Sequence, residues 1–420
     1  MTRSLLQWVG QTAMVAGIIR RVDDNESDCP MNLNDLLTDE SLRNTAFPCT
    51  REGVYLAHAA VAPMSGAAAE ALLEFTRRGS TGNPENEWST GQADDARTLA
   101  AQLIGAKASE ISLLGPTSVG LSLVARGLPW SPGDEVVYYS EDYPANVYPW
   151  AALREYGVEP RPIRTLYPGA VTWDKIEPML TDRTRLVSLA TCNFLSGFRI
   201  DIDDIGRRLH EREILFCVDG IQTLGAFPFS VEHVDFLSAD SHKWMLGACG
   251  SGIFYVDERL QERLAPWLLG SWNVVSPEFV AQEDIVLERG GRRYEPGTLN
   301  LPGIVPMAAS LRVLLDLGIE SIAARLLHLR RYLVERLADK GYILYLQDWE
   351  DSDHASDRHR SGIVTVFHKE HDMQAAFARL KAAGIVPSLR RNRAGLALLR
   401  IAPHAYTLES ELDRLLALLP

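Results

Sequence analysis

Residues Cys217–Val256 read CVDGIQTLGAFPFSVEHVDFLSADSHKWMLGACGSGIFYV, and they set the architecture expected for the rest of the chain. Two apolar runs, at 214–218 and 234–238, have the length and composition of short buried strands. The first run leads to Asp219 and the second leads to Lys243. Because ligands of open α/β sheets bind beyond the carboxyl ends of the strands, this order predicts a functional site that contains both side chains.

Lys243 is one of only six lysines among 42 basic residues, and the apolar segment Trp244-Met245-Leu246 follows it. An amine in apolar surroundings has a lowered pKa, so it can attack an aldehyde and hold it as a Schiff base. A carboxylate against a pyridine nitrogen keeps that nitrogen protonated, which lets the ring accept electrons from a substrate. A Lys-Trp pair on its own is more often a surface lysine lying over a tryptophan. Together with Asp219, however, Lys243 indicates pyridoxal phosphate chemistry.

Two short motifs carry a family resemblance: Asp219-Gly220-Ile221-Gln222, a DG-x-Q element, and Ser241-His242-Lys243-Trp244, an HKW element. With Lys243 24 residues after Asp219, the stretch resembles the class V aminotransferase family. These fold type I pyridoxal phosphate enzymes include cysteine desulfurases and isopenicillin N epimerase-like enzymes. The resemblance extends from about Tyr55 to Tyr406. It implies an α/β fold: a large domain with a mostly parallel, seven-stranded sheet covered by helices, and a smaller α+β C-terminal domain. It also implies an internal aldimine on Lys243.

A phosphate site is predicted in segment 111–120, ISLLGPTSVG, which runs from an apolar strand through a Gly-Pro turn into a helical pattern. Free N–H groups at a helix N-terminus and nearby hydroxyls bind anions, although the same residues also form ordinary helix caps. In the family this turn holds the cofactor phosphate, and Thr117 and Ser118 fall on it. The HKW element implies that His242 touches the same phosphate and that Ser241 belongs to the cofactor site.

Contacts with the cofactor ring follow from the same resemblance. Tyr143 falls on the position of the aromatic side chain that stacks on the pyridine ring. Asn193 ends a predicted strand at 185–193, and the family places this Asn within reach of the O3′ oxygen of the ring. Gln222 is expected to face the same oxygen or the ring edge. Thr298 lies in an "E-x-GT-x-N" element whose Thr reaches the phosphate of the neighbouring subunit's cofactor, which implies a homodimer.

Substrate contacts are expected from Arg400 and His58. Arg400 matches the family's arginine that binds the substrate α-carboxylate, for which a planar, two-pronged donor is suited, and this implies an amino-acid substrate. His58 lies in segment 54–63, whose small residues line the substrate pocket in the family. It is either a pocket residue or a core histidine. The arginines that precede Arg400 are expected to solvate a loop, with one of them meeting an acidic substrate side chain as the alternative: Arg390, Arg391 and Arg393.

The reaction is narrowed by a missing thiol. Desulfurase-like relatives carry a catalytic Cys just before the substrate arginine, and residues 385–399 contain none. We therefore expect an aminotransferase or an epimerase-like enzyme that acts at the α-carbon of an amino acid. Lysis of a C–S bond by β-elimination is the alternative, and a non-catalytic protein of the same fold is a remote one. A nicotinamide-binding Rossmann protein is disfavoured, because no G-x-G-x-x-G opens a helix after a strand.

Composition bounds the size and the partners of the protein. With 420 residues, of which 46% are hydrophobic, two domains are expected, and we divide the chain into an N-terminal extension (1–50), a large cofactor-binding domain (51–305) and a small domain (306–420). The net charge of −13 without a basic stripe argues against nucleic acid as a partner. Five irregularly spaced cysteines indicate reduced thiols, a cytoplasmic location and no metal site.

The N-terminus is apolar from Leu5 to Ile19, but this run is too short to span a bilayer, and Gln7, Trp8 and Gln11 interrupt it as a signal sequence. It is expected either to pack as a helix on a partner subunit or to have no role. Residues 22–50 are polar and turn-rich and are expected to be a lead-in. No other segment approaches a membrane span, so no membrane partner is expected.

Alternating strand and helix patterns from about 110 to 256 predict a parallel sheet with helices on both faces. Helical periodicity is found at 66–78, 93–104, 121–128, 201–212, 308–317, 319–340 and 372–383. Strand patterns outside Cys217–Val256 are found at 111–114, 135–139, 185–193, 363–367 and 398–401.

Overall fold

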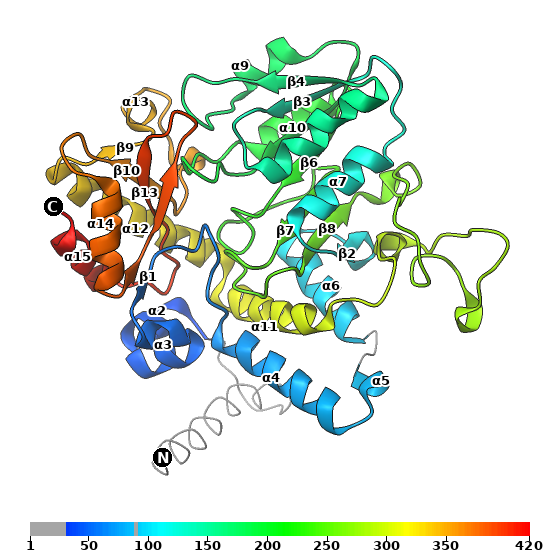
Figure 1. Ribbon diagram of the computed structural model, residues 1–420, viewed down its shortest axis with the longest axis horizontal. Helices are drawn as coiled ribbons and strands as arrows, with labels where there is room; N and C mark the ends of the chain where they lie inside the picture. Colours follow the sequence, from blue (N-terminus) through cyan, green and yellow to red (C-terminus); the bar gives the residue numbers. More distant parts are fainter. Residues whose placement is uncertain (1–30, 88–90) are drawn as a thin grey trace.

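A seven-stranded sheet forms the centre of the molecule in the computed structural model, which describes residues 31–87 and 91–420 (Figure 1). Its order is β2-β8-β7-β6-β5-β3-β4. The strands from β7 to β4 are parallel, whereas β8 runs antiparallel to both of its neighbours. The strands are β2 (Ile111–Leu113), β3 (Glu135–Tyr139), β4 (Glu159–Ile163), β5 (Thr184–Ala190), β6 (Leu215–Asp219), β7 (Phe236–Asp240) and β8 (Gly252–Val256). The predicted fold class is confirmed.

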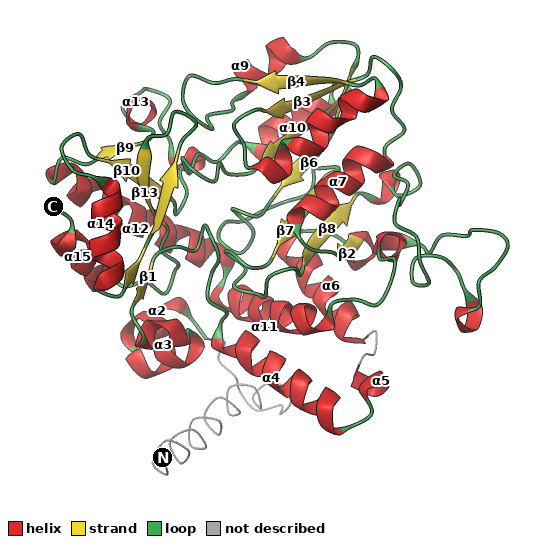
Figure 2. Ribbon diagram, viewed as in Figure 1, coloured by secondary structure: helices red, strands yellow, loops and turns green. Residues whose placement is uncertain are grey.

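Side chains of the central strands alternate between two hydrophobic cores, as the pleat of a strand requires. On β6, Phe216 and Val218 belong to the larger core and Cys217 belongs to the opposite one. Helices cover both faces of the sheet (Figure 2). The larger core includes side chains of α4 (Gly66–Thr81), α6 (Gly91–Ile104), α10 (Ile202–His210) and α11 (Leu301–Leu317). The opposite core includes side chains of α7 (Thr117–Gly127) and α8 (Tyr148–Ala151).

The edge strand β4 was not predicted from the sequence. It reads Glu-Pro-Arg-Pro-Ile, and its two prolines hide the strand pattern. Proline lacks the N–H that a ladder needs, so it is tolerated at an edge, and β4 is the last strand of the sheet order. Short helices outside the main pattern are α5 (Pro84–Glu87), α9 (Trp173–Ile176) and α13 (Gln347–Glu350).

A smaller antiparallel sheet, in the order β12-β13-β10-β9, lies in the C-terminal part of the chain. Its strands are β9 (Ile343–Leu344), β10 (Val364–Phe367), β12 (Ser388–Arg391) and β13 (Ala397–Ile401). It shares a separate hydrophobic core with α12 (Ile319–Asp339), α14 (Met373–Ala382) and α15 (Glu409–Leu418). This part therefore has the α+β composition that the sequence predicted.

The segment that precedes the large sheet is structured, which corrects the prediction of a polar lead-in. Helices α2 (Leu33–Thr38) and α3 (Glu40–Ala46) bury Leu36 and Phe47. Strand β1 (Val54–Tyr55) pairs in parallel with β11 (Ile385–Val386) from the far end of the chain. The sequence signal was weak because few apolar residues carry this packing. The predicted run at 5–19 lies outside the described residues.

The predicted boundary between 305 and 306 falls inside α11, which packs on α4 and α6. The change of direction comes later, at Gly318, where α11 and α12 meet at 78°. Within the described residues, no single helix is long and apolar enough to cross a membrane, and α11 with α12 meets that test only as a bent pair.

Candidate active site

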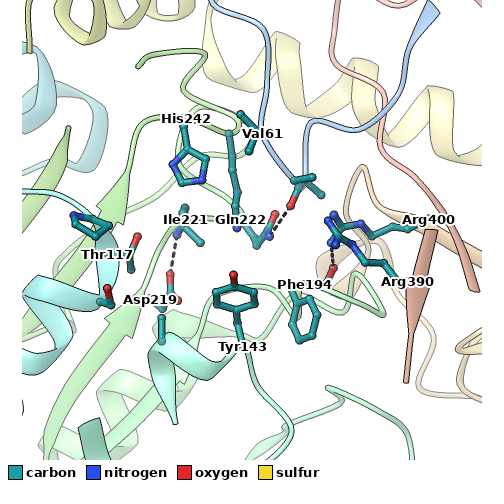
Figure 3. Close-up of a pocket in the computed structure, with 16 residues that line it drawn as sticks. Val61, Thr117, Tyr143, Phe194, Asp219, Ile221, Gln222, His242, Arg390 and Arg400 are labelled. Atoms are coloured by element: carbon teal, nitrogen blue, oxygen red, sulfur yellow. Dashed lines mark hydrogen bonds between the residues drawn. The ribbon is translucent and has the colours of Figure 1, made fainter. Parts of the chain in front are cut away.

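A cavity of about 370 Å³ opens at the carboxyl ends of the central strands (Figure 3). Its walls come from the segment after β1, the start of α7, the loops after β3, β5, β6 and β7, and the strands β12 and β13. The volume is in the range that small-molecule sites occupy. The cavity therefore lies where the sheet topology predicts a ligand, and the small C-terminal sheet closes one side of it.

Lys243 follows β7 and lies against the cavity with only 6% of its surface exposed. Its Nζ is 5.3 Å from the centroid of the Tyr143 ring. Burial lowers the pKa of Lys243 to about 8, against the opposing charge of Asp219. The neutral form of this amine, which attack on an aldehyde requires, is therefore far more populated near pH 7 than in an ordinary lysine.

Asp219 ends β6 and lines the same cavity, with 2% of its surface exposed. One carboxylate oxygen accepts a hydrogen bond from the backbone N–H of Ile221 at 3.0 Å. Burial raises the pKa of Asp219 to about 6, while that hydrogen bond and the charge of Lys243 act in the opposite direction. Asp219 is thus mainly ionised at pH 7, and a ring nitrogen that carries a proton is the partner it suits.

Thr117 and Ser118 begin α7 and line the cavity. Thr117 lies on the side of Asp219, at the other end from Arg390 and Arg400 (Figure 3). The Oγ1 atom of Thr117 accepts a hydrogen bond from the N–H of Asp240 at 2.9 Å, which leaves the hydroxyl proton available for an anion. The preceding Gly115 allows this turn to approach closely, because a Cβ there would be 2.6 Å from the backbone of Gly250. The start of α7 is therefore pressed against the chain that follows Lys243.

His242 lines this end of the cavity as well. Its Nδ1 atom is 2.5 Å from Oδ1 of Asp240, and the other oxygen of Asp240 accepts a hydrogen bond from Gly250 N–H at 3.0 Å. Asp240 thus fixes the orientation of the imidazole. Helix N–H groups, two hydroxyls and an imidazole make this end fit a phosphate group.

Tyr143 stands in the loop after β3 and presents an exposed ring to the cavity. Its ring meets that of Phe194 edge to face, with centroids 5.4 Å apart. The neighbouring Asp142 accepts hydrogen bonds from the backbone N–H groups of Tyr143 at 2.8 Å and Ala190 at 3.1 Å. Burial, with the nearby charge of Asp219, raises the pKa of Asp142 to about 7. Sequence reasoning did not single out Asp142, which lies in the loop after β3.

Gln222 lines the cavity, and both ends of its amide have protein partners. Its Nε2 donates to the carbonyl of Ala59 at 3.1 Å, and its Oε1 accepts from Nε1 of Trp244 at 2.9 Å. Gln222 therefore fixes the tryptophan beside Lys243 against the segment that follows β1. Gln222 lies in the cavity wall, and its contact with the cofactor ring stays a prediction.

Arg400, on β13, is 1% exposed and lines the cavity. Its Nη1 donates to the carbonyl of Phe194 at 2.5 Å. Its Nε and Nη2 are buried and have no hydrogen-bond partner among the described residues. Burial and the nearby Arg390 lower the pKa of Arg400 to about 9. Because buried donors are nearly always paired in native proteins, this unpaired edge is the expected site of a carboxylate.

Four predicted site residues, Thr298 among them, do not line this cavity. His58 is fully buried, with Nδ1 2.8 Å from the carbonyl of Ala402 and Nε2 2.7 Å from the Tyr406 hydroxyl, so it is a core histidine and not a substrate contact. Ser241 donates its hydroxyl to the carbonyl of Ala248 at 2.9 Å, which holds the turn after Lys243. In both cases the protein itself occupies the polar atoms that were assigned to a ligand.

Asn193 is the third such residue. It lines a separate cavity of only about 10 Å³ beside Asp142. Its Oδ1 accepts hydrogen bonds from the N–H groups of Leu195 at 3.1 Å and Ser196 at 2.9 Å. The carboxamide oxygen of Asn193 therefore stabilises the turn after β5. Thr298, the residue predicted to reach across a dimer, is exposed and does not line the cavity of its own chain.

Arg390 was expected to solvate a loop together with Arg391 and Arg393, with one of the three meeting an acidic substrate side chain as the alternative. Arg390 lies on strand β12 and lines the cavity (Figure 3). The strand was not predicted, because its apolar positions are few.

The lining residues fit pyridoxal phosphate. Thr117, Ser118 and His242 suit its phosphate, Asp219 suits its protonated ring nitrogen, and the neutral amine of Lys243 suits its aldehyde. The exposed ring of Tyr143 offers a surface on which the pyridine ring can stack. Arg400 remains for the carboxylate of a substrate.

Comparison with known proteins supports the same assignment. The family model described as aminotransferase class-V matches residues 54–394. A probable cysteine desulfurase of Methanothermobacter thermautotrophicus is 31% identical over 66% of this chain and 70% of its own. An uncharacterized aminotransferase of Bacillus subtilis is 27% identical over 76% of this chain and 80% of its own. The apo structure of a cysteine desulfurase from Thermococcus onnurineus superposes with a TM-score of 0.80 at 22% identity, over 90% of this chain and 96% of that one.

Proposed function

This chain belongs to the class V aminotransferase family, whose cofactor is pyridoxal phosphate, and on that premise we propose that it removes and returns protons at the α-carbon of an amino-acid substrate. One observation supports this most directly: Lys243, Asp219 and the unpaired edge of Arg400 line one cavity. When bound, the cofactor supplies an electron-accepting ring that stabilises negative charge at the α-carbon.

The chain's own side chains divide the remaining work. Arg400 binds the α-carboxylate through Nε and Nη2 and so orients the bonds at the α-carbon. Lys243 Nζ takes and returns the α-proton, and its lowered pKa of about 8 suits proton transfer near neutral pH. Asp219 holds a proton on the ring nitrogen by its charge. Tyr143 and Phe194 form one side of the cavity.

A transaminase or an epimerase-like enzyme needs only these groups, and this is the outcome we favour. The missing thiol supports it, because none of the described cysteines, Cys49, Cys192, Cys217 and Cys249, lines the cavity. Burial raises the pKa of Cys192 to about 11, so this thiol stays protonated and unreactive. Transfer of sulfur to a protein thiol is therefore disfavoured.

Lysis of a C–S bond by β-elimination is the second candidate. A relative 31% identical is named a probable cysteine desulfurase, and elimination needs no protein thiol. Lys243 would take the α-proton while the bond between the β-carbon and sulfur breaks. With cysteine and water, the net products would be pyruvate, ammonia and sulfide.

A panel of amino acids separates these outcomes. Cofactor-loaded protein is incubated with each amino acid in deuterated water, with and without a keto-acid acceptor, and α-deuterium, keto acid and sulfide are followed. Deuterium uptake with racemisation supports epimerisation, keto acid formed only with an acceptor supports transamination, and pyruvate with sulfide supports elimination. The Lys243→Ala variant is expected to lose at least about 10²-fold in rate, in the range of general acid–base catalysis.

The proposed function fails if the loaded protein exchanges no α-proton in any amino acid of the panel. It also fails if Lys243→Ala exchanges α-protons as fast as the parent. A second control is borohydride reduction of the loaded protein followed by peptide mapping, which is expected to leave the cofactor on the peptide that contains Lys243.

We also propose a homodimer in the cytoplasm, in which Thr298 of each subunit meets the phosphate end of the other site. The exposure of Thr298 supports the homodimer. The unpaired state of the described cysteines supports the cytoplasmic location. Light scattering is expected to give twice the chain mass. The Thr298→Ala variant is expected to keep that mass and bind the cofactor more weakly, whereas a monomeric mass for the loaded parent would contradict the proposal.

A further inference from the structure

Two guanidinium groups, Arg390 and Arg400, line one end of the cavity (Figure 3). They come from neighbouring antiparallel strands, on which Ser388 pairs with Arg400 and Arg390 pairs with Leu398. Arg390 and Arg400 are therefore diagonal neighbours on the same face of the small sheet. The register of β12 and β13 directs both side chains to the cavity.

Arg400 accounts for one carboxylate. Its Nη1 is already bound to the carbonyl of Phe194, and its Nε and Nη2 together form one side of the guanidinium. A carboxylate that accepts one hydrogen bond from each of these two atoms saturates the unpaired edge. Once the α-carboxylate of the substrate occupies this edge, Arg390 is not needed to bind it.

Arg390 has no carboxylate within ion-pairing distance among the residues that the structure describes, and its Nε is buried without a partner. The next two arginines both have protein partners. Arg391 donates to the carbonyl of Gly395 at 2.9 Å, and Arg393 donates to the carbonyl of Ser140 at 3.2 Å and lies 3.5 Å from the carboxylate of Glu141. Arg390 alone of these three lines the cavity.

The charge at this end of the cavity is unbalanced. Arg390 lowers the pKa of both Arg400 and Lys243 by like-charge repulsion, and Asp219 is the only carboxylate among the lining residues. Asp219 is the partner of the ring nitrogen, and the phosphate lies with Thr117 and Ser118. A second anion beside Arg390 would offset the repulsion between the two guanidinium groups.

We propose that the substrate is an amino acid with a second acidic group on its side chain, which Arg390 binds while Arg400 binds the α-carboxylate. This proposal rests on the proposed function, since it assumes that an amino acid occupies the cavity. It names the substrate class that the family resemblance left open.

Acid–amide pairs test the proposal, because aspartate and asparagine, and likewise glutamate and glutamine, differ mainly in charge. Cofactor-loaded protein is titrated with each pair by calorimetry, and α-deuterium exchange is followed in parallel. The parent is expected to favour the acid of at least one pair by about 10- to 150-fold, the range of a charge-assisted hydrogen bond. Equal affinity for acid and amide in both pairs, or no binding of either acid, overturns the proposal.

Variants locate the preference. Arg390→Gln is expected to abolish the acid–amide difference, weakening binding of the acid more than binding of the amide. Arg390→Lys is expected to retain part of the preference, because it keeps the charge. Arg391→Gln, a change on the same strand but outside the cavity, is expected to leave the preference intact. If Arg390→Gln weakens acid and amide equally, Arg390 serves the α-carboxylate and the proposal is wrong.

The design separates the two levels of inference. If every amino acid fails to exchange its α-proton, the proposed function fails, while calorimetry still measures the acid–amide preference. If neutral amino acids exchange as fast as acidic ones, the proposed function stands and only the second acidic group is excluded. A thermal melt of each variant checks that the change has not unfolded the protein.

Discussion

The reactivity of the Lys243 amine depends on its position in the folded chain and not on the local motif alone. Burial beside the cavity lowers its pKa to about 8, and the charge of Asp219 keeps that pKa from falling further. Arg390 and Arg400 act in the same direction as burial. A lysine on the surface, with a pKa near 10.4, would be almost entirely protonated at pH 7. The residue is thus prepared for attack on an aldehyde by its surroundings.

The first prediction concerns the pH dependence of cofactor capture. Only the neutral amine reacts, and a lowered pKa increases the neutral fraction at a given pH, so the rate of covalent attachment to apoprotein is expected to rise about tenfold per pH unit below pH 8 and to level off above it. Stopped-flow absorbance between pH 6 and pH 10 measures this rate.

The control for this measurement is N-acetyl-lysine amide in the same buffers. Its rate is expected to keep rising to pH 10, because nothing lowers the pKa of its amine. A protein profile that also rises without a plateau up to pH 10 would show that burial does not tune Lys243.

Among the elements, helix α7 connects the sheet to the phosphate end of the cavity. Its first residues, Thr117 and Ser118, line the cavity, and its middle lies tightly against β7 and β8. Ser238 on β7 donates its hydroxyl to the carbonyl of Thr117 at 3.0 Å. Gly120 allows this approach, since a Cβ there would be 2.4 Å from Oγ of Ser238 and 2.8 Å from the Phe254 ring.

The second prediction is that Gly120→Ala destabilises the protein and weakens cofactor binding. The added methyl group must displace Ser238 or move α7, and overpacking of this kind costs about 1–3 kcal/mol. Denaturant unfolding of apoprotein measures the change in stability, and fluorescence titration measures the affinity for pyridoxal phosphate.

Gly79→Ala is the matched control, because Gly79 is also in a helix but has no atom within 4 Å of its would-be Cβ. Alanine there is expected to stabilise helix α4 by about 0.5–1 kcal/mol and to leave cofactor affinity unchanged. If both alanine variants behave alike, the close contact between α7 and β7 is not the cause.

Over the whole molecule, the two ends of the described chain pack against each other beside the site. Arg43 on α3 donates to Glu411 at 3.1 Å and to the carbonyl of Tyr406 at 3.2 Å. The ring of Phe47 stacks on that of Tyr406 with centroids 4.1 Å apart. This segment then continues through β1 to Ala59, in the cavity wall. The N-terminal helices therefore support the site from outside it.

The third prediction is that Arg43→Met lowers the free energy of unfolding by about 3–5 kcal/mol, because it leaves the buried carboxylate of Glu411 without its partner. Arg207→Met removes exposed ion pairs with Asp204 and Glu211 and is expected to cost less than about 1 kcal/mol. Thermal and urea unfolding compare the two variants, and similar losses would contradict a special role for the buried pair.

Much of the fold could be predicted from the sequence, because hydrophobic periodicity is local. The apolar runs before Asp219 and Lys243 are β6 and most of β7, and the helical patterns at 66–78 and 319–340 are α4 and α12. Asp219, Lys243, Thr117 and Arg400 could be selected from the sequence, since motif chemistry depends on residue type and on position at the end of a strand. Their convergence on one cavity agrees with that selection.

The tertiary structure alone decided which polar side chains remain free for a ligand. His58, Ser241 and Asn193 have residue types suited to a site, yet protein groups already bond both ring nitrogens of His58, the hydroxyl of Ser241 and the Oδ1 atom of Asn193. Arg390 was expected in a solvated loop, and the register of two C-terminal strands places it in the cavity wall. The physical reason is the same in each case. The residue type determines which hydrogen bonds a side chain can make, but the packing of segments distant in the sequence determines whether a protein group or a ligand makes them.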